Sequence, residues 1–297
     1  MKNKALLVAA ALMALSSACK KQNNQENQLT DSKNKDCNCT IEQASPDSKA
    51  EIITFGKGSK QFKIEKKDGQ YILGGDMVLN EQQVAFLKRK YDQTGTVTES
   101  TFVDEFKKRW PGGVVYYAID PALPANKQAW VTGAISHWET NTKLTFVART
   151  TQANYVYFTP GSGCSSSVGM TGKRQNITLG NCSLGSTIHE IGHAIGLLHE
   201  QSRADRDDYI IINTDNIEDG KEHNFQTYVE RGLTGGETGA LDFGSIMMYP
   251  SSAFSSNGKP TITKLDGTTF TAQRNGLSAG DLTGIKYLYP DSVFQAN

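Results

Sequence analysis

Residues 189–200 read His-Glu-Ile-Gly-His-Ala-Ile-Gly-Leu-Leu-His-Glu, and this run holds three of the chain's five histidines. On a helix, His189 and His193 lie one turn apart, so both imidazoles can bind one metal ion at roughly 2 Å. A continued helix would carry His199 about 9 Å further along the axis than His193, too far for the same ion. We therefore expect Gly196 to end the helix, because glycine accepts a positive φ at little cost, and to return His199 to the metal.

Three neutral protein ligands leave one coordination position open for water, which is typical of a catalytic zinc rather than a structural one. Glu190, beside the first histidine, is the candidate general base. The alternative is an amphipathic helix whose histidines face a core, but the extended pattern fixes five positions together. The formal net charge is zero, so nothing favours nucleic-acid binding.

The pattern His-Glu-x-x-His-x-x-Gly-x-x-His resembles the metzincins, and a glutamate directly after it, here Glu200, is similar to the astacins. Residues 201–209 resemble the Arg-x-Asp-Arg-Asp stretch of that family, and residues 110–117 resemble its opening strand. Residues 245–249, Ser-Ile-Met-Met-Tyr, resemble its Ser-x-Met-His-Tyr turn, with Met248 in place of the histidine. The likeness covers about the last 190 residues.

This resemblance implies an α+β, two-subdomain zinc endopeptidase that acts on proteins or peptides and binds one catalytic Zn²⁺ ion. The upper half should be a twisted sheet with two helices, one of them the zinc-binding helix. The lower half, after Gly196, should be mostly irregular. A non-catalytic binding protein on the same scaffold is the alternative, but such a protein is expected to have lost Glu190 or a ligand. A structural zinc would usually have a fourth protein ligand.

The resemblance also assigns roles to single residues. Tyr249 would ligate zinc at rest and hydrogen-bond the oxyanion in the transition state, although a core tyrosine is the structural alternative. Met247 would form the apolar floor under the histidines. Glu200 would receive the amino group freed by maturation within residues 96–108, or else would only help to cap a turn.

Cys164 and Cys182 match the positions of an astacin disulfide, and two buried thiols are the alternative. They bracket residues 165–169, which correspond to the edge strand that in this family hydrogen-bonds an extended substrate backbone. Cys37 and Cys39 are too close together for an unstrained disulfide.

The N-terminus has the layout of a secretory signal, with two lysines, an apolar stretch over residues 5–15 and the run Ser-Ser-Ala-Cys. Cys19 suggests a bacterial lipoprotein, whereas Ser16 and Ala18 also suit ordinary signal peptidase. Both routes predict export, as a secreted protein or an outer-membrane lipoprotein of a bacterium, and membrane contact only through a lipid on Cys19. The sequence predicts four parts: a signal peptide (1–18), a polar tether (19–50), a propeptide (51–100) and the astacin-like zinc peptidase domain (101–297).

Residues 73–77, Leu-Gly-Gly-Asp-Met, resemble the astacin pro-segment motif Phe-x-Gly-Asp, with Leu73 in place of the phenylalanine. The resemblance implies that Asp76 occupies the open position of the zinc and keeps the precursor inactive. Two alternatives stay open, namely Asp76 as the N-cap of a helix and a thiolate of Cys37 or Cys39 as the zymogen ligand. We favour Asp76. Apolar spacing further predicts helices over residues 81–91 and 124–142.

Overall fold

Two stretches of chain form the described part of this computed structural model: an N-terminal segment, residues 41–92, and a main body, residues 109–290. The described residues are 41–57, 61–92, 109–233 and 235–290, all within the unit Asn38–Asn297. Among them, no helix is long and apolar enough to cross a membrane. The predicted signal peptide, Cys19, Cys37, Cys39 and the whole predicted maturation region, residues 96–108, lie outside these residues.

The N-terminal segment forms strands and one helix, and the helix agrees with the one predicted over residues 81–91. Their bounds are β1 Glu51–Phe55, β2 Phe62–Lys67, β3 Gln70–Leu73, β4 Met77–Leu79 and α1 Glu81–Asp92. Helix α1 packs Val84, Leu87 and Tyr91 into a small apolar cluster with the strands. Residues 41–48, which the sequence assigns to the tether, also belong to this packed segment, since Glu42 and Ala44 are buried.

The main body begins with a regular half that alternates strands and helices. Its elements are η1 Pro111–Gly113, β5 Val114–Ile119, α2 Ala125–Asn141, β6 Thr145–Ala148, β7 Tyr155–Pro160, β8 Cys164–Ser167, β9 Arg174–Leu179 and α3 Leu184–Ile195. The core fills the space between α2, α3 and one face of the sheet. The indole of Trp138 on α2 donates to the Ile188 carbonyl at 3.1 Å, and that of Trp110 donates to the Ala194 carbonyl at 2.9 Å. Both contacts fix the position of α3.

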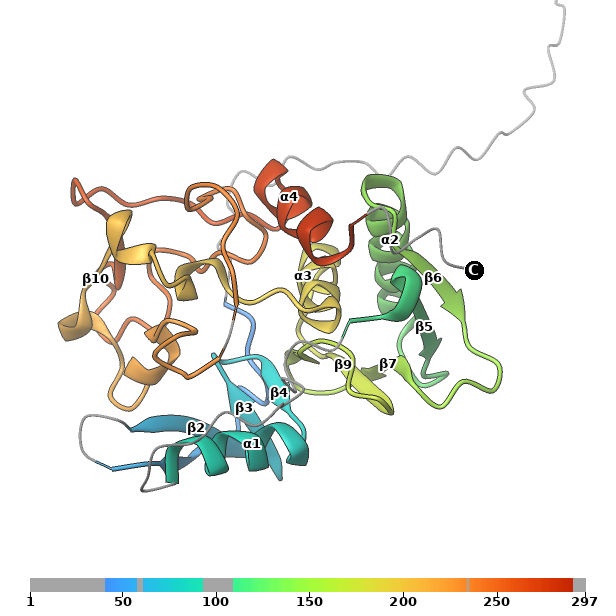
Figure 1. Ribbon diagram of the computed structural model, residues 1–297, viewed down its shortest axis with the longest axis horizontal. Coiled ribbons are helices and arrows are strands. Elements are labelled where there is room, and N and C mark those ends of the chain that lie inside the picture. The colour runs from blue at the N-terminus through green and yellow to red at the C-terminus, as the bar shows by residue number, and fades with distance from the viewer. Residues whose placement is uncertain (1–40, 58–60, 93–108, 234, 291–297) are drawn as a thin grey trace, which may run out of the picture. The chain divides into compact units, whose positions relative to one another are not determined.

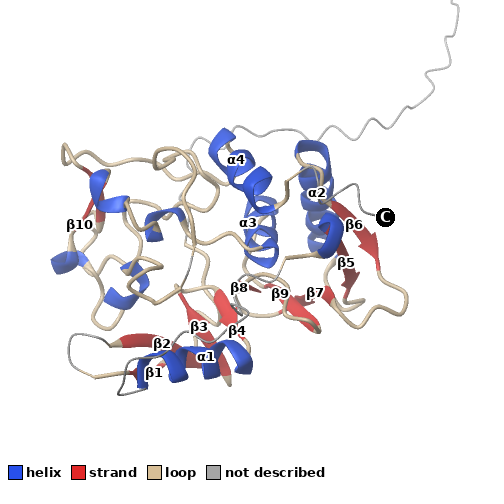
Figure 2. Cartoon of the chain, in the orientation of Figure 1, coloured by secondary structure: helices blue, strands red, loops and turns tan. Residues whose placement is uncertain are grey.

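The half after Gly196 is mostly loops, as expected (Figure 2). Its described elements are η2 Glu200–Ser202, η3 Arg206–Asp208, β10 Ile210–Ile212, η4 Thr214–Asn216, η5 Glu222–Phe225, β11 Ile262–Lys264 and α4 Ala279–Leu288. A second apolar cluster, which includes Met248, Tyr249 and Phe254, holds these loops together. The combination of a mixed sheet, helices and an irregular half confirms the α+β prediction.

One sheet joins the N-terminal segment to the main body. In the described part of the chain its nine strands run in the order β1-β2-β3-β4-β8-β9-β7-β5-β6 (Figure 1). Strand β4 pairs with β8 in parallel, with Met77 opposite Ser166 and Val78 opposite Ser167. The N-terminal segment therefore covers the edge strand that the family resemblance assigns to substrate binding.

Candidate active site

Helix α3 and the turn after it bring the three predicted histidines together. Gly196 has φ 114°, and its N–H donates to the carbonyls of Gly192 and His193. This left-handed residue ends α3 at Ile195, as predicted, and the chain returns at His199. At the other end the helix begins at Leu184, where the side chain of Ser183 caps it by accepting the N–H of Ser186.

The donor atoms of three histidines and one aspartate have the spacing of a tetrahedral metal site. The Nε2 atoms of His189 and His199 each lie 3.2 Å from Asp76 Oδ2, and the Nε2 atoms of His193 and His199 are 3.2 Å apart. His193 Nε2 is 3.6 Å from Asp76 Oδ1. Four ligands about 2 Å from a tetrahedral zinc ion stand about 3.3 Å apart. The residues therefore fit one zinc ion in both number and geometry.

The hydrogen bonds on the far side of two imidazoles fix their tautomers. His189 Nδ1 donates to the Ile246 carbonyl at 2.9 Å, and His193 Nδ1 donates to the Leu197 carbonyl at 2.8 Å. A carbonyl accepts only a protonated Nδ1, which leaves the Nε2 lone pair for a metal. Burial lowers the pKa of His199 to about 3, although Asp76 opposes this shift. His199 is therefore neutral at ordinary pH, as a metal ligand must be.

Asp76 lies in the tight turn between β3 and β4. Gly74 and Gly75 precede it with φ of 60° and 86°. A Cβ on Gly74 would stand 2.8 Å from the Met77 side chain and 3.3 Å from His199 Nδ1, so only glycine fits beside the histidines. Burial alone would raise the pKa of Asp76, but His199 and His193 hold it well below its usual range. The helix-cap alternative is wrong, because Asn80 caps α1 by accepting the N–H of Gln83.

Glu190 projects from α3 beside the ligands and is fully buried. Neither oxygen of its carboxyl group has a hydrogen-bond partner among the described residues. Burial raises the pKa of Glu190 well above its usual value, and the carboxylates of Asp76 and Glu42 add to this shift. Two of these three causes belong to the N-terminal segment, so its departure would lower the pKa of Glu190 again.

Residues 245–249 form a turn below the histidines, as the resemblance implies. Asp281 of α4 holds the turn by accepting from the Ser245 hydroxyl at 2.6 Å and from the Ile246 N–H at 3.0 Å. The Met247 sulfur lies 2.8 Å from the place where a Cβ on Gly192 would stand, so Gly192 is required by this close packing. The sequence pattern alone gave no reason for that glycine.

Tyr249 approaches the N-terminal segment instead of the histidine Nε2 atoms. Its hydroxyl donates to the Gly74 carbonyl at 2.5 Å, and its ring centroid lies 4.6 Å from that of His199. Burial raises the pKa of Tyr249 well above its usual value, so the phenol stays protonated and can donate. The Tyr249 hydroxyl is thus able to donate to a peptide carbonyl, here that of Gly74, next to the cluster of histidines.

Comparisons with known proteins agree with this geometry. The family model for the astacin peptidases matches residues 102–290. The chain belongs to the astacin family. Members of this family use one catalytic zinc ion, and the four buried donors described above provide a site for it.

The chain is 40% identical over 224 residues to flavastacin from Elizabethkingia meningoseptica, covering 72% of this chain and 50% of that protein. It is 35% identical over 266 residues to protein SpAN from Strongylocentrotus purpuratus, covering 84% of this chain and 42% of that protein. It thus spans half or less of the length of these two relatives. Among solved structures, high choriolytic enzyme 1, a hatching enzyme zinc-protease from the medaka Oryzias latipes, is 31% identical with a TM-score of 0.57. That match covers 64% of this chain and 98% of the medaka chain.

The edge strand β8 of this astacin is occupied along its length by the N-terminal segment. The N–H of Ser166 donates to the Asp76 carbonyl at 3.1 Å, and the N–H of Cys164 donates to the Gln43 carbonyl at 2.9 Å. Cys164 also forms the predicted disulfide with Cys182. The Gln43 and Asp76 carbonyls of the segment therefore accept from N–H groups of β8. An extended peptide paired with β8 would need the same N–H groups.

An ion pair that the sequence did not reveal lies next to these contacts. The carboxylate of Glu42 accepts from Arg274 Nη2 at 2.7 Å and from Arg274 Nε at 2.8 Å. Burial opposes ionisation of Glu42, but Arg274 holds its pKa at about 2. Arg274 also donates to the Met248 carbonyl at 3.2 Å, which places it at the metal site. No local pattern joins two residues 232 positions apart.

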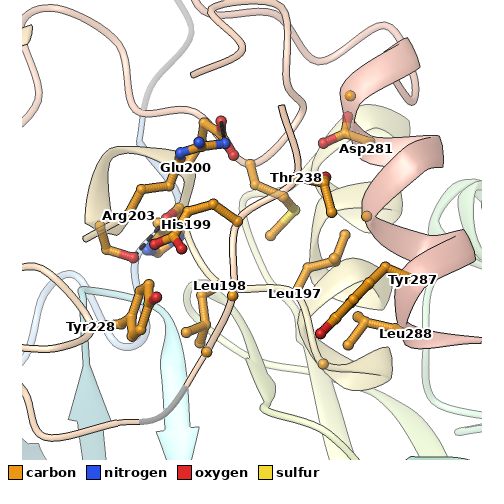
Figure 3. A pocket seen from close by; sticks show the side chains of 18 of the residues that line it. Leu197, Leu198, His199, Glu200, Arg203, Tyr228, Thr238, Asp281, Tyr287 and Leu288 are labelled. Atoms are coloured by element: carbon orange, nitrogen blue, oxygen red, sulfur yellow. Dashed lines mark hydrogen bonds and ion pairs between the residues drawn. The ribbon is translucent and has the colours of Figure 1, made fainter. Parts of the chain in front are cut away.

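Glu200 lines a cavity of about 250 Å³, to which His199 also contributes. Its Oε1 accepts from the Asp242 N–H at 2.9 Å and lies 3.4 Å from Arg203 Nη1. Burial raises its pKa. Figure 3 shows Glu200 and Arg203 on one wall, with Tyr287 of α4 on the other. Arg109, the first described residue of the main body, also lines this cavity.

Proposed function

We propose that this astacin is an exported zinc endopeptidase made as a latent precursor, in which residues 41–92 block the active site. One observation carries the proposal. Asp76 completes a tetrahedral set of donors with His189, His193 and His199, whose Nε2 atoms point at the same place. A carboxylate at the fourth position leaves no room for the catalytic water, so the same four residues explain both the activity and its absence.

His189, His193 and His199 are the residues that would hold the zinc ion. When bound, zinc supplies Lewis acidity, which activates water and polarises the peptide carbonyl. Glu190 takes the proton of the attacking water as general base and delivers it to the leaving amine. The Tyr249 hydroxyl donates to the developing oxyanion, and its bond to the Gly74 carbonyl, a peptide oxygen, supports this role.

Maturation would change the cleft in three ways. Loss of Asp76 opens the fourth position, loss of the β4 pairing frees strand β8, and loss of two carboxylates lowers the pKa of Glu190. A new terminus before Arg109 would then lie near the cavity that Glu200 lines. We propose that Glu200 accepts this amino group there, where the terminus would pair with a buried carboxylate.

The pairing of Glu42 with Arg274 supports a substrate preference. When the segment leaves, the Arg274 guanidinium loses the carboxylate of Glu42, so the carboxylate of a substrate side chain could take the same place. We propose that Arg274 binds an acidic side chain next to the scissile bond. A matched pair of peptides with glutamate or glutamine at that position tests this, and Arg274→Gln should abolish the difference in kcat/KM.

Export rests on the sequence of residues 1–19, which lie outside the described residues. We propose a signal peptide over residues 1–18, followed by free secretion or by lipid attachment at Cys19 in a bacterium. The predicted boundary between tether and propeptide moves to residue 41 or earlier, because Glu42 and Ala44 are packed into the cleft. Labelling with a palmitate analogue separates the two export routes.

The experiment that tests the function uses the matured chain, from which residues before about 100 have been removed. It should hydrolyse casein, lose this activity in a zinc chelator and regain it when zinc is restored. The precursor starting at Lys20 should be inactive under the same conditions. A matured, zinc-loaded chain that cleaves neither casein nor peptides would favour the alternative, a binding protein on a protease scaffold.

A further inference from the structure

A second buried carboxylate of the N-terminal segment binds the main body away from the zinc site. Glu65 on β2 is 1% exposed. Its Oε1 lies 2.7 Å from Lys221 Nζ and 3.4 Å from His223 Nε2, and its Oε2 lies 3.2 Å from Lys67 Nζ within the segment. Burial alone would raise the pKa of Glu65, but His223 and Lys221 hold it well below its usual range. Glu65 is therefore a fully ionised group in a site built from main-body residues.

Two chains of contacts connect this site to the cleft. Lys221 Nζ stands 5.6 Å from the centre of the Phe254 ring, and that ring lies 3.1 Å from the place where a Cβ on Gly75 would be. On the other side, Arg231 Nη2 donates to the carbonyl of His223 at 3.3 Å. The site is thus separated from the Gly74–Asp76 turn, which occupies the cleft, by one ring or one side chain.

Arg231 adds a further positive charge next to Lys221 and His223, and we call these three residues the cleft wall. Its guanidinium is buried, and its Nε has no hydrogen-bond partner among the described residues. Its Nη1 lies 3.2 Å from the place where a Cβ on Gly74 would stand. Gly74 therefore covers Arg231, while Glu65 covers Lys221 and His223, so departure of the segment uncovers these three side chains together.

The register of the strands gives the position of Glu65 relative to strand β8. Glu65 is opposite Ile72, Ile72 is opposite Val78, and Val78 is opposite Ser167 at the carboxyl end of β8. Glu42 instead lies beside Cys164, at the amino end of β8, through the bond to Gln43. Since β2 is two strands beyond β4, Glu65 lies about 10 Å from the position of a chain paired with β8. The two carboxylates thus mark opposite ends of the cleft.

We propose that Lys221 and His223, supported by Arg231, form an exosite of the mature enzyme that binds acidic groups of long peptide or protein substrates. This inference rests on the proposed peptidase function and adds a binding surface to it. Glu65 occupies the exosite in the precursor as a stand-in for a substrate carboxylate. Because the site lies about two strand spacings from the scissile chain, short peptides do not reach it.

The test uses mature zinc-loaded enzyme and one cleavable core peptide in five forms. The core is used alone, or extended through a flexible linker by four glutamates or four glutamines at either end. Glutamate at one of the two ends should raise kcat/KM about 5- to 10-fold over glutamine, mainly through KM, and the advantage should shrink with salt because exposed charges are screened. Equal values for glutamate and glutamine at both ends would overturn the proposal without any variant.

Variants then assign the effect to the exosite. The double variant Lys221→Gln/His223→Gln should bring the glutamate-to-glutamine ratio close to one, whereas Lys259→Gln, an exposed lysine of the same half, should keep it. Lys221→Glu should transfer the advantage to a peptide extended by four lysines. A ratio that survives both exosite variants would overturn the assignment. Failure to cleave the bare core would instead refute the peptidase function, so the two failures are distinct.

Discussion

The N-terminal segment and helix α3 meet at the same metal site but are held there by different forces. Helix α3 is fixed by apolar packing, with Ile188 and Ile191 in the core between the sheet and α2. The segment shares an apolar cluster with Val168, Tyr228 and Leu233 of the main body. In addition, it holds the cleft through backbone pairing with β8 and through buried carboxylates on histidines, an arginine and a lysine. Apolar packing makes a permanent site, whereas buried charge pairs depend on every partner being present.

Under the proposed maturation, this difference would let the zinc-binding half stay rigid while the N-terminal segment is released. Breaking one member of a buried ion pair costs about 3–5 kcal/mol, because a charge is left without a partner. Removal of either partner of such a pair is therefore strongly destabilising while the segment is in place. After it leaves, solvent and substrate can satisfy the same cations, and α3 keeps the ligands in position.

The largest expected effect concerns helix α3, which carries Glu190. Glu190→Gln should keep zinc but lower peptidase activity on the order of 10²- to 10⁴-fold or more, because a positioned acid–base group is lost. Zinc content and casein hydrolysis are measured on the same preparation of matured chain. A fully active, zinc-loaded variant would contradict the mechanism.

The next largest effect concerns the N-terminal segment, which carries Asp76. Asp76→Ala should make the precursor leaky, with activity about 10²-fold above that of the wild-type precursor, because an internal ligand at high effective concentration is removed. Asp47→Ala is the matched control, since that carboxylate is exposed in the same segment.

A thiolate switch makes the opposite prediction for the same assay. Cys37→Ser or Cys39→Ser would then be the leaky variant, and thiol reagents would activate the wild-type precursor. If Asp76 is the switch, both serine variants should stay latent.

A smaller effect is expected at Tyr249, which faces both regions. Tyr249→Phe should lower kcat about 10- to 10³-fold and change KM less, since the phenol acts on the oxyanion. Zinc should remain bound to the three histidines. Loss of the metal, measured by atomic absorption, would show instead that the phenol is chiefly a structural ligand.

The smallest effect concerns the turn that returns the chain to the zinc. Gly196→Ala should destabilise the protein by about 1 kcal/mol, because φ of 114° strains an alanine while its Cβ meets nothing closer than 4.0 Å. Such a loss lowers Tm by about 2–4 °C in a chain of this size. Gly236→Ala, where a Cβ meets open space and φ is not positive, is the control and should leave Tm unchanged.

The features predicted correctly from the sequence are those fixed by neighbours in the chain. The spacing of His189 and His193 and the glycine at 196 define a helix and its end, so local geometry suffices. The helix predicted over residues 124–142 followed from apolar spacing, and the structure has it as α2, Ala125–Asn141. The start of α3 has a weaker local signal, because Gly185, a poor helix former, lies in its first turn and only the Ser183 cap marks the boundary.

The features that were missed depend on contacts between distant parts of the chain. Glu42 meets Arg274, and Glu65 meets Lys221, only because β4 extends the sheet at β8. Neither pair has a local signature, since single glutamates in polar stretches are usually solvated. Residues 41–48 were assigned to a tether for the same reason, because their burial is provided by the main body.

The most direct test of the account is zinc X-ray absorption on the purified precursor starting at Lys20. We predict three nitrogen ligands and one oxygen ligand at about 2.0–2.2 Å, with the oxygen lost from the protein ligand set in Asp76→Ala. A sulfur ligand at about 2.3 Å would contradict the role of Asp76 and assign the latency to a cysteine. A precursor with this coordination and full activity before any cleavage would contradict the latency itself.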